Sequence, residues 1–254
     1  MIVIVANRWD QTPKAVASRW GEPNVAVLTA QDLSVAGWRQ HLNGMDGGTA
    51  VVDRKLVPQK EIAGVLTLMP CVYEQELVEI APEDRSYVAT EMTAFLLFWL
   101  SRLQFQCPVL NRPTPTCLSG PHWRREQWVH AAAQAGIPVQ PARRHAAPHA
   151  PAEHAPAEHG SAAQEETIAD STTVTVVGKR VFGEAEPDLQ RQARHLADLA
   201  GVELLAVRFS GPEHGARFLS ADSFPNLSDD KLADAVLEHL RGGLALALGL
   251  RRCA

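Results

Sequence analysis

A change of composition in the middle of the chain limits what it can fold into. Residues 141–171 consist largely of Ala, Pro, His and Glu, and they include a tandem repeat of the five residues Ala-Pro-Ala-Glu-His. Such a segment has almost no large apolar side chains with which to build a core. We therefore predict a disordered linker at 141–171, with folded parts before and after it.

The overall composition is that of a globular protein without a strongly charged surface. The chain has 254 residues, of which 46% are hydrophobic, so it can bury a sizeable core in one large or two small domains. Its formal net charge is only -5, and Lys and Arg never occur in runs longer than pairs. We therefore expect no nucleic-acid partner.

The apolar stretches are too short for a targeting or membrane segment. The N-terminal run, residues 1–6, lacks the basic leader and the length of a signal peptide, and the stretch 93–100 is well below membrane-spanning length. We expect a cytoplasmic protein with no membrane partner. The cysteines show no metal-binding spacing, which favours free thiols at Cys71, Cys107, Cys117 and Cys253.

Strand-like and helix-like patterns alternate along the first 140 residues. Short apolar runs predict strands at 2–6, 25–28, 62–68 and 107–113, the last of which ends in a Pro-containing loop. Helical spacing predicts helices at 13–20, 32–42, 85–103 and 120–135, and residues 49–58 are a predicted hairpin that turns on Asp53 and Arg54. This alternation is typical of an open α/β sheet.

The part after residue 171 is predicted to be α+β. Residues 172–183 favour a β segment that turns near Gly178, and 188–200 favour a helix closed by Gly201. Strands are expected at 202–209 and 216–219, joined by a polar turn. A last helix is expected from about 229 to 240 or further, with Ser228 as its N-cap.

Arg8 follows the first predicted strand, at the end where α/β folds bind ligands. We weigh a binding role for Arg8, as an anion contact, equally against simple capping of the loop. Trp9 and Trp123 flank loops and are candidates for a pocket or an interface. Trp99 and Trp128 lie on apolar helical faces and are predicted to be core residues.

Histidines recur every four or five residues within the linker. They are accompanied by two glutamates, and such a set can bind Zn²⁺ or Ni²⁺ weakly; the residues are His145, His149, Glu153, His154, Glu158 and His159. The simpler interpretation is a flexible tether that grew by repeat expansion, and we favour it.

The octapeptide 220–227, with the strands that precede it, resembles a known signature. It is similar to the C-terminal hairpin of ATP-grasp ligases of the RimK and glutathione synthetase type. In that family, an Asp on the first strand and a Glu and an Asn on the second hold the magnesium ions of ATP. Here Arg208 takes the place of the Asp, Ser220 that of the Glu and Asp222 that of the Asn, while Pro225 is retained.

The first part of the chain also resembles this family. Residues 107–113 are similar to its apolar-Leu-Asn-x-Pro strand end, residues 87–91 to its Tyr-x-x-x-Glu helix, and residues 123–139 to an element that ends in Gly-Ile-Pro. The resemblance implies a Rossmann-like pre-ATP-grasp domain at 1–118, a connecting helix at 119–140 and the remnant of an ATP-grasp C-terminal lobe at 172–254. It also makes Asn111 and Arg112 candidate cofactor-binding residues and Asp222 the candidate metal ligand. Two further cofactor-binding candidates are Arg8, from its place after the first strand, and Arg208, which could contact a phosphate directly in place of the missing cation.

One part of the family pattern has no counterpart in this sequence. The linker stands where the ATP-grasp A subdomain would supply lysines and a Gly-rich phosphate loop, and it contains no Lys. Nucleotide phosphates need cations and backbone N–H groups around them, and Mg²⁺ needs hard oxygen ligands. The three replaced ligand positions differ from the family by a net two positive charges. We therefore expect that the A subdomain is missing, that the sites for ATP and Mg²⁺ are lost, and that the protein has no cofactor.

Two functions remain open. We favour a degenerate RimK-like homologue that serves as a non-catalytic binding or partner subunit for an ATP-grasp ligase in a biosynthetic or peptide-modifying pathway. Its partner would be another protein or a second copy of the chain, with a small molecule or peptide as a further ligand. The alternative is an enzyme, an ATP-dependent carboxylate–amine ligase completed in trans by a partner chain.

Overall fold

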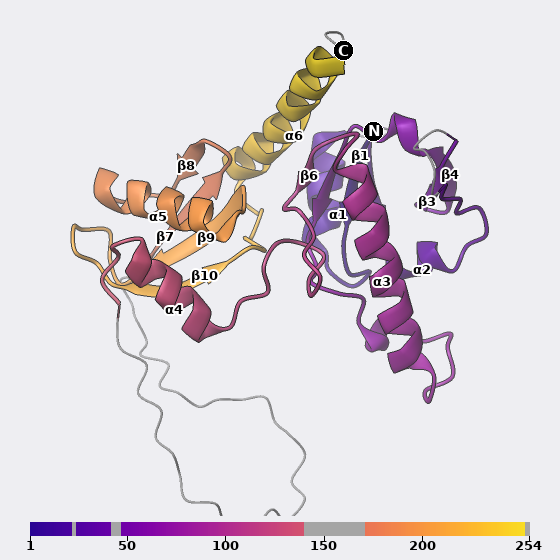
Figure 1. Cartoon of the computed structure of the whole chain (residues 1–254), viewed down its shortest axis with the longest axis horizontal. Helices are drawn as coiled ribbons and strands as arrows, with labels where there is room; N and C mark the ends of the chain where they lie inside the picture. Colours follow the sequence, from indigo (N-terminus) through magenta and orange to yellow (C-terminus); the bar gives the residue numbers. More distant parts are fainter. Residues whose placement is uncertain (22–23, 42–46, 140–170, 252–254) are drawn as a thin grey trace, which may run out of the picture.

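The computed structural model of the protein describes residues 1–21, 24–41, 47–139 and 171–251. Figure 1 shows two lobes side by side, an N-terminal lobe coloured indigo to magenta and a C-terminal lobe coloured orange to yellow. The predicted linker lies outside the described residues except for Ser171, and so do all of its histidines. None of the described helices is long and apolar enough to cross a membrane.

A parallel sheet of four strands forms the N-terminal lobe. The strands lie in the order β2-β1-β5-β6 and are all parallel: β1 Ile2–Val5, β2 Val25–Leu28, β5 Gly64–Thr67 and β6 Val109–Leu110. β1 and β5 are buried along their whole length, as expected for parallel strands covered on both faces. The α/β class predicted from the sequence is confirmed.

Helices and a hairpin cover the two faces of this sheet. The helix α1, Thr12–Trp20, packs on one face through Val16, Ala17 and Trp20. The long helix α3, Arg85–Leu103, packs on the other face together with the hairpin of β3, Thr49–Val52, and β4, Lys55–Pro58. Two short 3₁₀ turns complete the connections, η1 Gln59–Glu61 and η2 Glu74–Glu76.

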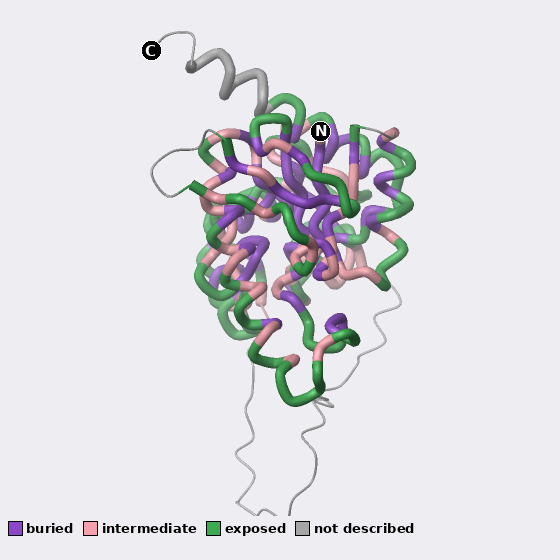
Figure 2. The backbone as a smooth tube through the Cα atoms, turned by 90° about the vertical axis from the view of Figure 1, so that its right-hand side faces the viewer, coloured by how far each residue is buried: buried purple, intermediate pink, exposed green. Residues whose placement is uncertain are grey.

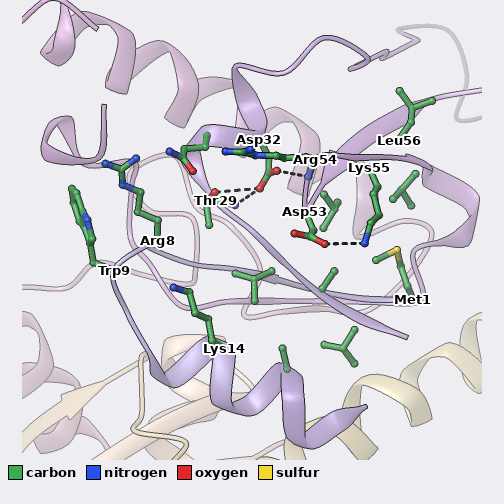
Figure 3. A pocket seen from close by; sticks show the side chains of 17 residues that line it. Met1, Arg8, Trp9, Lys14, Thr29, Asp32, Asp53, Arg54, Lys55 and Leu56 are labelled. Carbon is green, nitrogen blue, oxygen red and sulfur yellow. Dashed lines mark hydrogen bonds and ion pairs between the residues drawn. The ribbon is translucent and has the colours of Figure 1, made fainter. Parts of the chain in front are cut away.

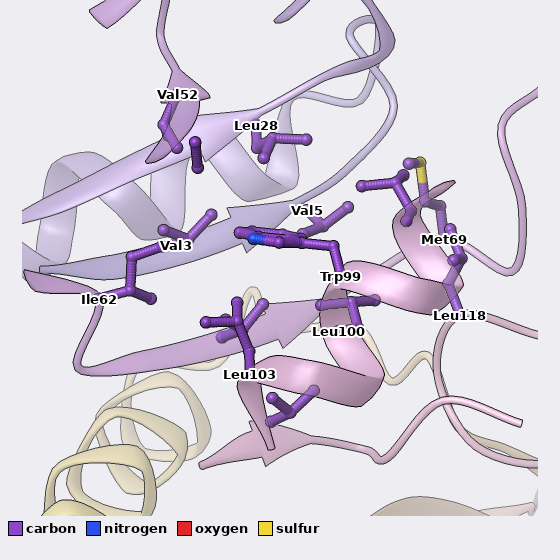
Figure 4. Close-up of a cluster of buried hydrophobic side chains, with 14 of the residues drawn as sticks. Val3, Val5, Leu28, Val52, Ile62, Met69, Trp99, Leu100, Leu103 and Leu118 are labelled. Atoms are coloured by element: carbon purple, nitrogen blue, oxygen red, sulfur yellow. The ribbon is translucent and has the colours of Figure 1, made fainter. Parts of the chain in front are cut away.

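Trp99 lies at the centre of the core between the parallel sheet and α3. Its side chain is fully buried between Val3 and Val5 of the sheet and the neighbouring turns of its own helix (Figure 4). Trp38 meets it edge-on, with ring centroids 5.4 Å apart. The predicted core position of Trp99 is confirmed, and so is that of the buried Trp128.

Two predicted helices begin or end differently in the structure. The helix expected at 32–42 is the short α2, Ala30–Leu33, because the chain is already extended at Arg39, which forms an antiparallel bridge with Thr49. The helix expected from residue 120 is α4, Arg125–Gln134, and it starts five residues later. Gly120 has a φ of 74°, which a right-handed helix does not accommodate.

An antiparallel sheet of four strands forms the C-terminal lobe. Its order is β10-β9-β7-β8, with β7 Thr172–Val177, β8 Arg180–Phe182, β9 Leu204–Phe209 and β10 Phe218–Asp222. The helix α5, Pro187–Ala200, covers one face together with α4 and encloses a second core. β10 therefore continues through Asp222, three residues beyond the predicted strand end.

The last helix joins the two lobes. It is α6, Asp230–Arg251, and Val236 and Leu240 share a buried cluster with Ile4 of β1 and Leu204 of β9. Its first turn is capped by Asp229 and not by the predicted Ser228, because Asp229 Oδ1 accepts the backbone N–H of Leu232 at 2.8 Å. In Figure 2 the buried segments, in purple, lie inside the molecule, and exposed segments outline it.

The cysteines that the structure describes are free thiols, as predicted: Cys71, Cys107 and Cys117. Burial raises the pKa of Cys107 to about 12, so this thiol stays protonated near neutral pH. Cys253 lies outside the described residues.

Candidate functional site

One face of the antiparallel sheet is covered by helices and the other carries polar side chains. Along β9, Leu205, Val207 and Phe209 are buried toward α4 and α5, so the alternation of the strand places Arg208 on the opposite face. The register sets Arg208 between Thr173 of β7 and Ser220 of β10, and all three residues are exposed. They form a polar row across three strands.

Asp222 lies on the same face, two residues along β10 from Ser220. It is paired with Ala206, which is in turn paired with Thr175. The Oδ1 atom of Asp222 accepts the backbone N–H of Phe224 at 2.9 Å, and partial burial raises the pKa of its carboxyl group. We call this surface the open sheet face and define it by its residues Thr173, Thr175, Ala206, Arg208, Ser220 and Asp222.

The donor set of the open sheet face does not fit a pair of magnesium ions. Asp222 is the one carboxylate among the residues that define it, and Arg208 brings a positive charge. The Nε and Nη2 atoms of Arg208 donate to Ser171 Oγ at 3.0 and 2.9 Å. Mg²⁺ is held by several hard oxygens, usually including carboxylates. Across the described part of the chain, no group of three or more His, Cys, Asp or Glu side chains is placed to hold a metal ion.

Asn111 ends β6 and connects the two lobes. It is only 1% exposed, and its Nδ2 donates to the carbonyl of Leu204 at 2.8 Å. Its Oδ1 accepts the backbone N–H groups of Glu203 at 2.9 Å and of Leu204 at 2.8 Å. Most of its hydrogen-bonding capacity is thus used at the start of β9. Its role as a cofactor-binding residue stays a prediction.

Arg112 is exposed beside this junction. Hydrogen bonding to His239 lowers the pKa of Glu203, and the charge of Arg112 contributes to the same shift. Arg112 and Arg208 lie near opposite ends of β9, since Leu204 and Arg208 are separated by about 13 Å of extended strand. The structure therefore does not bring the predicted binding residues of the two lobes together in one site.

Arg8 follows β1 and lies apart from both the open sheet face and the junction at Asn111. Its backbone N–H donates to Glu76 Oε2 at 3.1 Å, and its Nη1 lies 3.5 Å from Glu79 Oε1. Its guanidinium group stacks on Trp9, 4.7 Å from the ring centroid. Both side chains line a groove beside β2 (Figure 3). The placement of Trp9 agrees with the pocket role considered for it.

Glu76 is a buried carboxylate for which the sequence offered no signal. It is fully buried in the short turn η2, and no hydrogen-bond partner for its Oε1 is found within the described residues. Burial raises the pKa of this carboxyl group. A single Glu in a loop has no periodicity, so only the folded structure reveals that it is enclosed.

The comparison with family models gave no match, and no curated protein matched the chain. Solved structures do match. The macrocyclase MdnC bound with precursor peptide MdnA, from Microcystis aeruginosa MRC, has a TM-score of 0.66 at 12% identity, over 95% of this chain and 100% of that one. The ATP-grasp ligase PsnB complexed with minimal precursor, Mg and ADP has a TM-score of 0.61 at 15% identity, over 94% and 98%.

A RiPP-associated ATP-grasp ligase from Chryseobacterium gregarium, in complex with ADP and a leader and core peptide, has a TM-score of 0.56 at 12% identity, over 100% of this chain and 97% of that one. The chain has the ATP-grasp ligase fold. Identities this low establish the architecture and not the activity. Within the ATP-grasp fold, the open sheet face belongs to the C-terminal lobe, and Asn111 and Arg8 belong to the lobe before it.

Proposed function

We propose that the protein is a non-catalytic relative of ATP-grasp ligases. In this proposal it is a cytoplasmic, RimK-like binding or partner subunit for an active ATP-grasp ligase in a biosynthetic or peptide-modifying pathway. The observation that carries the proposal is the composition of the open sheet face, where Arg208 and Ser220 stand at positions that the family pattern gives to carboxylates.

The charge on this face opposes a metal–nucleotide complex. A guanidinium group next to a Mg²⁺ site adds repulsion where two carboxylates would supply attraction. Asp222 is the one carboxylate left among the residues that define this face, and burial raises the pKa of its carboxyl group. The remaining ligand is therefore too poor to hold Mg²⁺ on its own.

The proposal includes the loss of the A subdomain. Among the described residues, β7 is the first element after α4, and the residues between them, 135–171, are too few for an additional layer of about 60 residues. The open sheet face would then be free to contact a partner chain. The matched structures MdnC and PsnB are described with precursor peptides, which supports a peptide or protein as the partner.

The test combines nucleotide binding with complex formation. The full chain is purified alone and together with an ATP-grasp ligase encoded beside it. Titration calorimetry with Mg-ATP is expected to show no binding to the lone chain, and size-exclusion chromatography is expected to show a complex with the ligase. Arg208→Glu on the open sheet face should weaken that complex, whereas Lys231→Ala, an exposed control on α6, should not.

Two results would contradict the proposal. One is a micromolar dissociation constant for ATP that is lost in Asp222→Ala. The other is substrate-dependent release of ADP by the lone chain.

A second candidate function rests on the exposed guanidinium of Arg208. Its hydrogen-bond acceptor, the Ser171 hydroxyl, does not neutralise its charge, so the group is available to contact a phosphate. In this alternative, the chain completes a carboxylate–amine ligase whose nucleotide is held mainly by the partner. Arg208→Ala would then abolish ligation by the complex while leaving the complex itself intact.

A further inference from the structure

β2 is the edge strand of the parallel sheet, and part of its backbone is unpaired. The N–H of Ile2 donates to Asn24 O at 2.7 Å, and the N–H of Ala6 donates to Leu28 O at 3.0 Å. Because backbone groups alternate along a strand, those of Val25 and Val27 point away from β1. Within the described residues, no strand pairs with this outer side. It is a template on which another extended chain can form hydrogen bonds.

A groove of about 730 Å³ runs beside this edge (Figure 3). One wall is α1, which contributes Lys14 and Ala17, and the opposite wall is the β3–β4 hairpin. The floor is apolar and includes Val25 and Val27. The four residues of β2 extend over about 13 Å, so the groove follows an extended segment and not a single small group.

The groove carries more positive than negative charge. Its cationic side chains come from the β1 end, from α1 and from the hairpin: Arg8, Lys14, Arg54 and Lys55. Arg8 is paired with Glu79 and Lys55 with Asp53, so the positive excess comes from Lys14 and Arg54. The two carboxylates of the groove belong to Asp32 and Asp53. Among the described residues, no carboxylate contacts the Lys14 ammonium group or the Arg54 guanidinium group.

Both carboxylates already have partners within the protein. Asp32 is buried, and its Oδ2 accepts the backbone N–H of Thr29 at 2.8 Å while its Oδ1 accepts that of Arg54 at 2.8 Å. Asp53 Oδ2 lies 3.0 Å from Lys55 Nζ. The groove is therefore complementary to an anionic ligand.

The hairpin turn holds Arg54 in a backbone conformation that favours glycine. Asp53 has a φ of 49° and Arg54 a φ of 58°, both in the left-handed region. Two-residue hairpin turns with both φ values positive prefer Asn-Gly or Asp-Gly, because a Cβ atom is strained there. The buried Asp32 supports the turn by binding the backbone N–H of Arg54. An arginine is thus held at the groove despite the strain.

We propose that this groove binds an acidic peptide in extended conformation, which adds a strand to β2. The peptide backbone pairs with Val25 and Val27. Its side chains alternate, so that acidic groups reach Lys14 on one side and Arg54 on the other. Arg8 and the half-exposed Trp9 meet the peptide where β2 ends. The groove lies on the N-terminal lobe, apart from the open sheet face, so this inference does not depend on the proposed function.

The experiment measures fluorescence anisotropy with the full chain. The probe is a fluorescein-labelled peptide of repeating Glu-Val-Asp sequence, about six to nine residues long, so that it extends past both ends of the four-residue strand β2. One control peptide has Gln and Asn in place of Glu and Asp. A second keeps the acids but is N-methylated at alternate residues, so that it cannot donate backbone hydrogen bonds along one edge. Arg54→Gly and Lys14→Ala are compared with Lys231→Ala, an exposed lysine on the other lobe.

The acidic peptide is expected to bind saturably to the natural chain. Its affinity should be about tenfold lower for each groove variant, the effect of losing one charge-assisted contact, and unchanged for Lys231→Ala. Because glycine suits the turn, Arg54→Gly should remain folded by circular dichroism, and Arg54→Ala provides a second variant with the native strain. The amide resonances of Val25 and Val27 should shift on binding.

Three outcomes would overturn the proposal. The first is equal binding of the Gln/Asn control, which would show that the groove does not recognise acidic groups. The second is that N-methylation has no effect on binding while inorganic triphosphate displaces the probe, which would identify a site for small anions instead. The third is that the acidic peptide shows no saturable binding at millimolar concentration.

Discussion

Asn111 and Leu204, from different lobes, are joined by two hydrogen bonds of 2.8 Å between a side-chain amide and a backbone. A third bond, from the N–H of Glu203, completes the contact. Because Asn111 is buried, losing its amide leaves backbone groups at the start of β9 without partners and without water. This residue fixes where the antiparallel sheet meets the parallel one.

The first prediction concerns this contact. Asn111→Ala should lower the free energy of unfolding by about 3 kcal/mol, the effect expected for several buried hydrogen bonds lost together. Urea unfolding followed by circular dichroism measures it. Asn24→Ala, at an exposed position, is the matched control and should change stability by less than about 0.5 kcal/mol. A loss below about 1 kcal/mol in Asn111→Ala would mean that the contact does not hold the lobes together.

The second prediction tests strain in the β3–β4 turn. Arg54→Gly should raise the free energy of unfolding by about 0.5–1 kcal/mol. Relief of a left-handed residue is worth about 1–2 kcal/mol, and the greater freedom of glycine in the unfolded chain offsets about 0.5–1 kcal/mol of it. Arg54→Ala keeps a Cβ atom and should show no such gain. If Arg54→Gly were instead less stable than Arg54→Ala by about 0.5–1 kcal/mol, only the entropic cost of glycine would remain and the turn would be unstrained.

The third prediction concerns Glu76 and pH. Burial raises its folded-state pKa above the unfolded value, so the folded protein holds this proton more tightly. The contribution of Glu76 to stability is therefore most favourable below the unfolded pKa, and it is lost as the pH rises through the folded pKa. Urea unfolding from pH 4 to pH 8 should show a smaller decline in Glu76→Gln than in the natural chain.

A substitution at a neighbouring glutamate distinguishes the effect of burial on the pH dependence from the effect of charge. Glu74→Gln removes the same charge from an exposed position in the same turn, and its stability should follow the natural chain at every pH. If Glu74→Gln and Glu76→Gln behave alike, the pH dependence arises from surface charge and not from the buried carboxylate.

The regular elements were predictable because their signals are local. The β-branched runs of β1 and β2 and the long apolar helix α3 carry their period in the sequence itself. The length of α2 was overestimated, because the bridge between Arg39 and Thr49 depends on a strand ten residues further on. Tertiary pairing of this kind overrides a helical pattern that is only moderately strong.

The sites were harder to predict because their geometry depends on residues far apart in the sequence. The resemblance selected Arg208, Ser220 and Asp222, and the register places all three on one face. It could not indicate that Asn111 binds a backbone more than ninety residues away. Nor could it indicate that Asp32 supports the turn at Arg54, because neither partner belongs to a motif.

The last prediction concerns the open sheet face. The double variant Arg208→Asp with Ser220→Glu removes one positive charge and adds two negative ones, next to Asp222. Because clustered carboxylates are good ligands for Mn²⁺ and Mg²⁺, it should bind Mn²⁺ with a dissociation constant in the millimolar range or tighter. Electron paramagnetic resonance of free Mn²⁺ measures the binding. The natural chain should bind at least about tenfold more weakly, as expected where a cation replaces ligands.

A matched pair of substitutions controls for net charge. Arg125→Asp with Ser86→Glu makes the same change at exposed positions on two different helices, and it should not create a site. Neither double variant should hydrolyse ATP, because the restored carboxylates supply metal ligands but no groups that hold the phosphates. If the natural chain already binds Mn²⁺ as tightly as Arg208→Asp with Ser220→Glu, the open sheet face is a working metal site and the proposed loss of catalysis is wrong.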